Sequence, residues 1–175
     1  MQKEIIILAA AIIIAAASIV TGFTANVIKA VTIQQNHHAI IETDKGEIDI
    51  LLFEDQNPVT TKNFITLVNR GFYNGLTFHR VVPGFVIQTG DPTGTGAGGP
   101  GYTIPDEYSN LTNVRGAVGM ANTGSPNTGG SQFYILMEDA PWLNGRNPVF
   151  GQVVRGYDIV LKINQGDVVK SIKIV

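Results

Sequence analysis

Most of the chain is a succession of short, strand-like apolar segments separated by turns rich in glycine and proline. Residues 46–53 (GEIDILLF) show this most clearly, because acidic and apolar side chains alternate there at the period of a half-buried strand. The 20 glycines and 8 prolines favour many tight turns and a β-rich domain rather than a helical bundle. The segments do not alternate with helices, which disfavours a parallel α/β sheet. The sequence therefore predicts a mainly β fold, a closed or nearly closed antiparallel barrel with two helices over its ends.

The expected strands begin at residue 39 and continue to the end of the chain. In chain order they cover residues 39–44, 46–53, 77–79, 85–89, 117–121, 131–137, 149–154 and 168–175. A first helix is expected over residues 58–70, because Asn57 can cap it, Pro58 suits its first position and Gly71 can end it. Its apolar face is expected to contain Val59, Phe64, Leu67 and Val68. Residues 157–164 (YDIVLKIN) predict a short second helix.

The N-terminal part of the chain has a different composition. Residues 5–26 contain no charged side chain, and the stretch slightly exceeds the ~20 residues that a helix needs to span a bilayer core. Lys3 before it favours a cytoplasmic N-terminus with the remainder exported. We interpret residues 1–26 as a hydrophobic membrane anchor or signal peptide, residues 27–38 as a linker and residues 39–175 as the folded domain. The domain is then expected outside the cytoplasm, membrane-anchored or, after cleavage, secreted.

Composition also excludes several kinds of site. The chain has no cysteine, so disulfides, thiolate metal sites and a cysteine nucleophile are absent. Its net charge is −2 and it contains no basic run, which disfavours nucleic-acid binding. His37 and His38 have no acidic or cysteine neighbour in the sequence, so we interpret them as a solvated pair in the linker. No metal site is expected.

The glycine-rich segment 90–103 contains Gly94-x-Gly96-x-x-Gly99, which has the form of a dinucleotide-binding fingerprint. That fingerprint requires a helix directly after it, whose N-terminus holds the pyrophosphate. Proline and glycine follow the third glycine here and prevent such a helix. We therefore expect a flexible surface loop and no cofactor.

A single cation stands inside the apolar run at residues 78–91 (FHRVVPGFVIQTGD). Burying an unpaired charge is costly, so Arg80 is expected to meet a partner or substrate in a dry groove rather than ordinary solvent. The chain has neither a Gly-x-Ser-x-Gly elbow nor a His-Glu-x-x-His motif. One arginine, several amides and many apolar or aromatic side chains remain. That set suits binding of a peptide backbone and an apolar side chain, without a nucleophile or base.

Three segments together resemble the signature blocks of the cyclophilin family of peptidyl-prolyl cis/trans isomerases. They are residues 78–91 (FHRVVPGFVIQTGD), 120–135 (MANTGSPNTGGSQFYI) and 142–153 (WLNGRNPVFGQV). The resemblance covers residues 39–175 in the family's order. It implies a closed eight-stranded antiparallel β-barrel capped by two α-helices. It also implies an enzyme that accelerates rotation about X-Pro bonds in peptides and folding proteins.

The resemblance further implies which residues form the site. By its position, Arg80 is similar to the family's catalytic arginine, which stabilises the twisted amide. The positions that match the family's substrate-binding residues are Phe85, Val86, Gln88, Ala121, Asn122, Thr123, Gln132, Tyr134, Trp142, Leu143 and Asn147. His79 is a possible support for the site. The chain departs from the family at Tyr134, usually Phe, at Val86, commonly Met, and at Asn147, often His.

The implied partners are proline-containing peptides, unfolded or exported protein clients and a cyclosporin-type inhibitor. We also expect a monomer that meets the membrane through residues 5–26 and binds no nucleic acid. An alternative is a membrane-tethered proline-peptide binding module or chaperone whose catalysis is incidental. Arg80 favours the enzyme, because a module selected only for binding can dispense with it.

Overall fold

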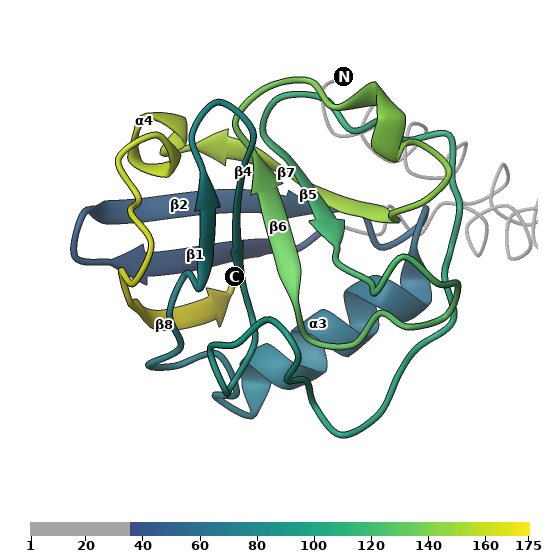
Figure 1. Cartoon of the computed structure of the whole chain (residues 1–175), viewed down its shortest axis with the longest axis horizontal. Coiled ribbons are helices and arrows are strands. Elements are labelled where there is room, and N and C mark those ends of the chain that lie inside the picture. The colour runs from purple at the N-terminus through teal and green to yellow at the C-terminus, as the bar shows by residue number, and fades with distance from the viewer. Residues whose placement is uncertain (1–35) are drawn as a thin grey trace, which may run out of the picture. The chain divides into compact units, whose positions relative to one another are not determined.

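The computed structural model describes residues 36–175, which contain eight β-strands, two α-helices and one short 3-10 helix (Figure 1). The strands are β1 (His38–Thr43), β2 (Gly46–Leu52), β3 (Arg80–Val82), β4 (Val86–Thr89), β5 (Ala117–Met120), β6 (Phe133–Leu136), β7 (Val149–Arg155) and β8 (Val169–Ile174). The helices are α3 (Pro58–Asn69), α4 (Tyr157–Val160) and the 3-10 helix η1 (Pro141–Leu143). The predicted mainly β architecture with two α-helices is therefore confirmed.

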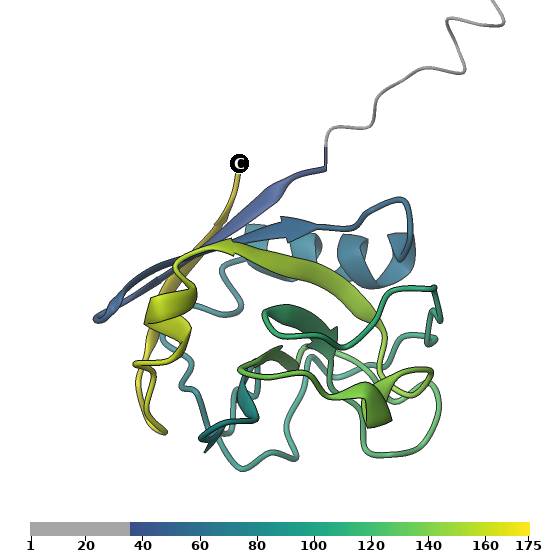
Figure 2. The ribbon, with the colours of Figure 1, turned by 90° about the horizontal axis from the view of Figure 1, so that it is seen from above.

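All eight strands belong to one antiparallel sheet, in the order β3-β4-β6-β5-β7-β2-β1-β8. The sheet curves strongly, as Figure 2 shows from above. Full closure of the barrel is not confirmed, because within residues 36–175 the edge strands β3 and β8 share no ladder. An isolated bridge between Thr77 and Val168 joins the segments that precede these two strands. The barrel is thus open at this seam apart from the bridge and its neighbouring hydrogen bonds.

The seam also explains a shift in one predicted strand. A strand was expected at residues 77–79, but β3 begins at Arg80. Residues before it bond to the far edge of the sheet instead, since the Phe78 amide donates to the Asp167 carbonyl at 2.8 Å. The first hairpin matches its prediction more closely. There β1 pairs with β2 so that Ile41 lies opposite Ile48.

Helix α3 begins at Pro58 as predicted and ends at Asn69, just before the predicted residue 70, but its N-terminal cap differs from the prediction. The side chain of Asn57 makes no capping hydrogen bond and donates instead to the Val149 carbonyl at 2.5 Å. The Glu107 carboxylate accepts from the amides of Val59 at 2.9 Å and Thr60 at 2.7 Å. A distant carboxylate thus satisfies the first free amides of the helix and complements its dipole.

The predicted apolar face of α3 is wrong at one position. Phe64, Leu67 and Val68 are buried, whereas Val59 is 42% exposed. Helix α4 is also shorter than the predicted 157–164. After Val160 the chain enters turns that lead directly to β8.

The main hydrophobic core lies between α3 and the inner face of the sheet. Its centre consists of four aromatic side chains, Phe64, Tyr73, Phe133 and Phe150, all at most 1% exposed. The ring centroids of Phe64 and Phe133 are 5.3 Å apart in an edge-to-face arrangement. A second, smaller cluster covers the opposite face of β4, β5 and β6, and the candidate site adjoins it.

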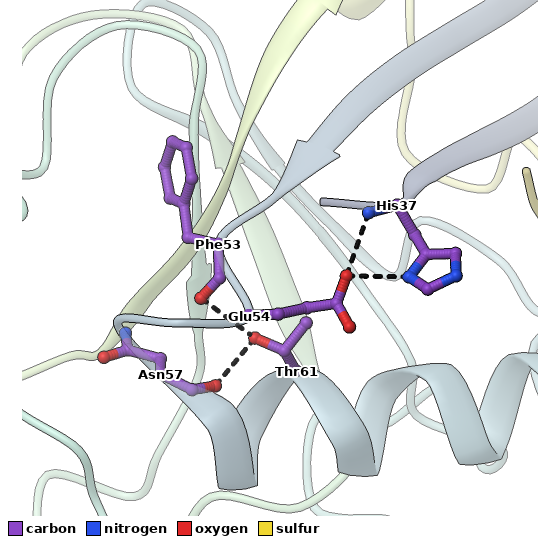
Figure 3. A network of polar contacts seen from close by, with 5 residues as sticks. All are labelled: His37, Phe53, Glu54, Asn57 and Thr61. Carbon is purple, nitrogen blue, oxygen red and sulfur yellow. Dashed lines mark hydrogen bonds and ion pairs between the residues drawn. The ribbon is translucent and has the colours of Figure 1, made fainter. Parts of the chain in front are cut away.

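The folded domain includes the two histidines that the sequence placed in a linker. His38 opens β1, and its Nδ1 lies 2.7 Å from Asp49 Oδ1. Glu54, in the loop after β2, accepts from the His37 amide at 2.9 Å and lies 2.8 Å from His37 Nδ1 (Figure 3). Figure 3 also shows the hydroxyl of Thr61, in α3, donating to the carbonyls of Phe53 and Asn57 in the same loop. The loop therefore connects the beginning of the domain to the helix.

The acidic partners of the two histidines were invisible in sequence because they come from other segments. No group of three His, Cys, Asp or Glu side chains within residues 36–175 is arranged to hold a metal ion. Among the helices of this part of the chain, none has the length and apolar character needed to cross a bilayer. The predicted anchor or signal at residues 5–26, and the linker up to residue 35, lie outside the described residues.

Candidate active site

A groove of about 710 Å³ runs over the outer face of β3, β4 and β6. Its lining is contributed by these strands and the turn between β3 and β4, by the loops before and after β5, and by the end of η1 with the segment that follows it. The lining residues are Arg80, Phe85, Val86, Gln88, Tyr108, Ala121, Asn122, Thr123, Gly124, Ser125, Pro126, Tyr134, Leu143, Gly145, Arg146 and Asn147. The groove combines an apolar base with amide and guanidinium groups. This composition is expected of a site that binds an apolar side chain together with the peptide backbone on either side of it.

The base of the groove follows from the alternation of side chains along two paired strands. Val86 on β4 and Tyr134 on β6 both point to the outer face and are almost fully buried. The Tyr134 hydroxyl donates to Asn113 Oδ1 at 2.6 Å, which satisfies the polar end of the ring. Gly119 on β5 makes room for that ring, since a Cβ there would collide with the Tyr134 phenol. Burial raises the pKa of Tyr134, so the phenol stays neutral.

Arg80 lies on the exposed edge strand β3, and this corrects the expectation of a cation in a dry groove. Its Nη1 donates to Gln88 Oε1 at 3.3 Å, and its Cζ lies 5.6 Å from the centroid of the Phe85 ring. These contacts are a hydrogen bond and a cation–π interaction. The guanidinium is therefore exposed to solvent on one side and held at the groove by Gln88 and Phe85 on the other.

A chain of amides continues from Arg80 into the glycine-rich loop. Gln88 Nε2 donates to Gln132 Oε1 at 2.8 Å. Gln132 Nε2 then donates to the carbonyls of Gly96 at 2.9 Å and Gly98 at 2.8 Å. The loop that resembled a dinucleotide fingerprint thus fixes an amide of the candidate site, through its backbone carbonyls.

Asp91 organises this loop from within. Its side chain is 1% exposed and accepts from the Thr93 amide at 2.7 Å and the Gly96 amide at 2.5 Å. Burial raises the pKa of Asp91, but hydrogen bonds from Thr93, Gly98 and Gly96 outweigh it and lower the pKa to about 2. The loop also lines a second hollow of about 490 Å³ that shares Gln88 and residues 121–123 with the groove.

The opposite rim is formed by η1 and the residues after it. Trp142 is 58% exposed, and its ring centroid lies 5.7 Å from that of Phe85. Asn147 Nδ2 donates to the Met120 carbonyl at 3.0 Å, and Asn122 Nδ2 donates to the Arg146 carbonyl at 2.9 Å. These bonds join the rim to the edge segment that follows β5.

The structure brings most of the predicted site residues together. Those that line the groove are Arg80, Phe85, Val86, Gln88, Ala121, Asn122, Thr123, Tyr134, Leu143 and Asn147. Gln132 lines the second hollow, and Trp142 packs on Phe85 at the rim.

His79 does not line the groove. Both of its ring nitrogens are buried and have no hydrogen-bond partner within residues 36–175. Burial lowers the pKa of His79, against the opposing effect of the Asp91 charge, so its ring is neutral near pH 7. Its role in supporting the site remains a prediction.

The predicted set of site residues left out several side chains that the structure places at the groove. Tyr108 and Arg146 line the groove, and Asn113 Oδ1 accepts the hydrogen bond of the buried Tyr134 hydroxyl. Arg146 lies inside one of the quoted blocks, so its charge was visible. Asn113 and Tyr108 gave no usable signal, because each reaches the site from a loop without local regularity.

Comparisons with known proteins agree with this geometry. Residues 38–175 match the family model described as cyclophilin type peptidyl-prolyl cis-trans isomerase/CLD. A peptidyl-prolyl cis-trans isomerase of Synechococcus elongatus is 48% identical over 139 residues, which cover 78% of this chain and 95% of the relative. Peptidyl-prolyl cis-trans isomerase B of Bacillus subtilis is 48% identical over 133 residues, covering 75% of this chain and 92% of the relative.

A solved structure is similar in fold as well. It is a cyclophilin type peptidyl-prolyl cis-trans isomerase of Cryptosporidium parvum, crystallised in the presence of the dipeptide Ala-Pro. The TM-score is 0.74 at 35% sequence identity, and the match covers 79% of this chain and 98% of that one.

Proposed function

The chain belongs to the family of cyclophilin-type peptidyl-prolyl cis-trans isomerases, and we propose that it accelerates X-Pro rotation by presenting Arg80 to the twisted prolyl amide. The observation that carries this proposal is the position of the Arg80 guanidinium. It is held at the groove by Gln88 and Phe85 through one hydrogen bond and one ring contact. An arginine has five N–H donors, so others are available to a substrate.

The barrier to the reaction arises from amide resonance and amounts to about 18–20 kcal/mol. When the bond twists, the prolyl nitrogen becomes pyramidal and more basic. A donor aimed at that nitrogen binds the transition state more strongly than the planar ground state, which is the condition for catalysis. The fixed charge of arginine suits this role without any proton transfer.

The apolar base of the groove suits the proline ring. Val86, Tyr134 and the partly buried Leu143 and Phe85 offer a surface without a charge. The edge segment 121–123 lies beside them, where the backbone of an extended peptide can bind. The Cryptosporidium structure was obtained in the presence of the dipeptide Ala-Pro, which supports a proline-containing substrate for this chain.

The proposal is tested by Arg80→Ala in the full chain. We expect kcat/KM for a proline peptide to fall by roughly 10²- to 10³-fold, as for loss of a donor to a transition state. The circular dichroism spectrum and melting temperature are expected to stay close to wild type, because Arg80 is exposed. Arg70→Ala is the matched control, since this exposed arginine at the end of α3 lies outside the groove.

The alternative, a proline-peptide binding module with incidental catalysis, gives a different result. Arg80→Ala would then keep its peptide affinity and its protection of an unfolded client in full, and the lost turnover would have no effect on client folding. Near-normal turnover of the variant would contradict the catalytic role of Arg80 itself.

We further propose that residues 5–26 anchor the domain to a membrane or direct its export. Their length and lack of charge support this. Membrane fractionation of the native protein, with the mass of its mature N-terminus, distinguishes the outcomes. A full-length protein in the soluble cytoplasmic fraction would contradict both.

A further inference from the structure

We propose that the groove selects proline peptides carrying a carboxylate side chain beside the proline, and that Arg146 is the residue that recognises it. This inference rests on the proposed isomerase function of the same groove. It concerns substrate choice, not rotation of the X-Pro bond.

The charges around the groove provide the first argument. Two of its lining residues, Arg80 and Arg146, are cations, and none is Asp or Glu. The chain as a whole has a net charge of −2, so this cationic groove contrasts with the rest of the molecule. The neighbouring hollow formed by the glycine-rich loop is lined by no charged residue. We therefore expect the groove to attract an anionic substrate group, and the hollow neither to attract nor to repel it.

The position of Arg146 is fixed by hydrogen bonds of its backbone. Its amide donates to the Leu143 carbonyl at 3.0 Å, and its carbonyl accepts from Asn122 Nδ2 at 2.9 Å. Leu143 and Asn122 both line the groove. The side chain therefore starts from a backbone position fixed between the apolar base and the edge segment, and it lines the same groove as the apolar surface proposed for the proline ring.

The side chain of Arg146 is also open to a ligand. It is exposed, and the ion pairs formed within residues 36–175 include neither Arg146 nor Arg80. The carboxylate of Asp106 contacts one lining residue of the groove, Tyr108, and within residues 36–175 it forms no ion pair with Arg146. Its Oδ2 accepts from the Asn127 amide at 2.9 Å and from the Tyr108 hydroxyl at 2.8 Å.

The planar guanidinium of arginine matches a carboxylate through two parallel hydrogen bonds. Because the site is solvent-exposed, the expected gain is modest, about two- to fivefold in kcat/KM at low salt. Salt near 1 M shortens the Debye length to roughly 3 Å and is expected to remove most of it. Since Arg80 acts on the rotating bond, Arg146 is expected to change KM rather than kcat.

The test uses the full chain and peptides that differ at one position, with Glu, Gln or Lys directly before or directly after the proline. We expect wild type to favour Glu over Gln and Gln over Lys at one of the two positions. Arg146→Lys is expected to keep that order, Arg146→Gln to abolish it and Arg146→Glu to reverse it. The control Arg70→Gln removes the same charge outside the groove and is expected to keep the wild-type order.

Peptide affinity, measured by calorimetry with the same series, provides a readout that does not depend on turnover. Equal affinities for the Glu and Gln peptides, or a Glu preference that survives in Arg146→Gln, would overturn the inference. In either case normal turnover of the Gln peptide would leave the proposed isomerase function standing. A wild type that turns over none of the peptides would contradict the proposed function instead.

Discussion

The two faces of strand β6 differ sharply although they are formed by adjacent residues. Phe133 and Ile135 point into the main core, where they are fully buried among aromatic and aliphatic side chains. Tyr134 and Leu136 point the opposite way, into the smaller cluster beneath the groove. That cluster ends in partly buried side chains such as Phe85, which remain open to a ligand. The same strand therefore supplies stability on one side and a binding surface on the other.

The contrast extends to polar groups. The main core contains one buried phenol, Tyr73, whose hydroxyl donates to the Ser131 carbonyl at 3.1 Å. The groove side contains a network in which the Tyr134 hydroxyl donates to Asn113 Oδ1, and the backbone N–H of Asn113 donates to Asn144 Oδ1 at 2.8 Å. Side-chain networks depend on partners from several loops, whereas the core depends on area removed from water. Substitutions on the core face should therefore lower mainly the stability of the fold, whereas substitutions on the groove face should also change KM for a peptide.

The largest effect is expected from Phe133→Ala on the core face. Phe133 packs edge-to-face against Phe64 at 5.3 Å and Tyr73 at 5.5 Å between ring centroids. Its removal leaves a cavity that the surrounding rings cannot fill, so unfolding free energy should fall by about 3–5 kcal/mol. Urea denaturation followed by fluorescence and circular dichroism measures this.

Phe85→Ala is the matched change on the groove face. Because Phe85 is only partly buried, we expect a smaller loss of stability together with a higher KM for proline peptides. If both variants lost the same stability and neither altered KM, the division between the two faces would be wrong.

Sequence patterns predicted what is local. The extent of α3 follows from Pro58 at its start and Gly71, at φ +68°, after its end. The register of the β1–β2 hairpin follows from alternation around a short turn. The resemblance to cyclophilins predicted most of the groove lining, since whole blocks of sequence contribute neighbouring side chains.

Contacts between distant segments were not predictable. Glu107 caps α3 from 48 residues away in sequence, and no local pattern at Asn57 indicates that its own side chain bonds elsewhere. The exposure of Arg80 was mispredicted, because an apolar run suggested burial while the strand lies at the sheet edge and is three residues long. Pairing order, not composition, determines which side of such a run meets solvent.

An intermediate effect is expected from Asp91→Asn, inside the glycine-rich loop that holds Gln132. An amide cannot accept from all the N–H groups that converge on the buried carboxylate, and its own N–H₂ would face donors. We expect a loss of roughly 1–3 kcal/mol in unfolding free energy at pH 7. A lower kcat/KM should accompany it, because the loop carbonyls that hold Gln132 would shift.

The pKa of Asp91 determines how the stability difference between wild type and Asp91→Asn changes with pH. The folded-state pKa of Asp91 is about 2, below its ordinary value of 3.8, so the ionised form stabilises the folded protein. That contribution is complete above about pH 5 and is lost as the pH falls toward 2. The stability difference between wild type and Asp91→Asn should therefore narrow on acidification. Asp158→Asn is an exposed control, whose partner Lys162 is also exposed, and its stability should stay close to that of wild type at every pH. A difference independent of pH would contradict the assignment.

The smallest effect is expected from Tyr134→Phe, and it separates the two faces most cleanly. The ring beneath the groove remains, but the buried Oδ1 of Asn113 loses its donor, which costs about 1 kcal/mol of stability. Because Asn113 also holds Asn144, within the segment that carries Leu143 and Arg146, we expect KM for a proline peptide to change with it.

Tyr73→Phe makes the same chemical change in the main core, where the hydroxyl bonds to the Ser131 carbonyl. It should lose a similar amount of stability and leave KM at the wild-type value, since Tyr73 does not line the groove. Chemical denaturation and peptide turnover of both variants, measured side by side, test this difference. If the two substitutions altered KM equally, the Tyr134 hydroxyl would have no special connection to the rim. The network from Tyr134 to Asn144 would then serve stability alone, as the core does.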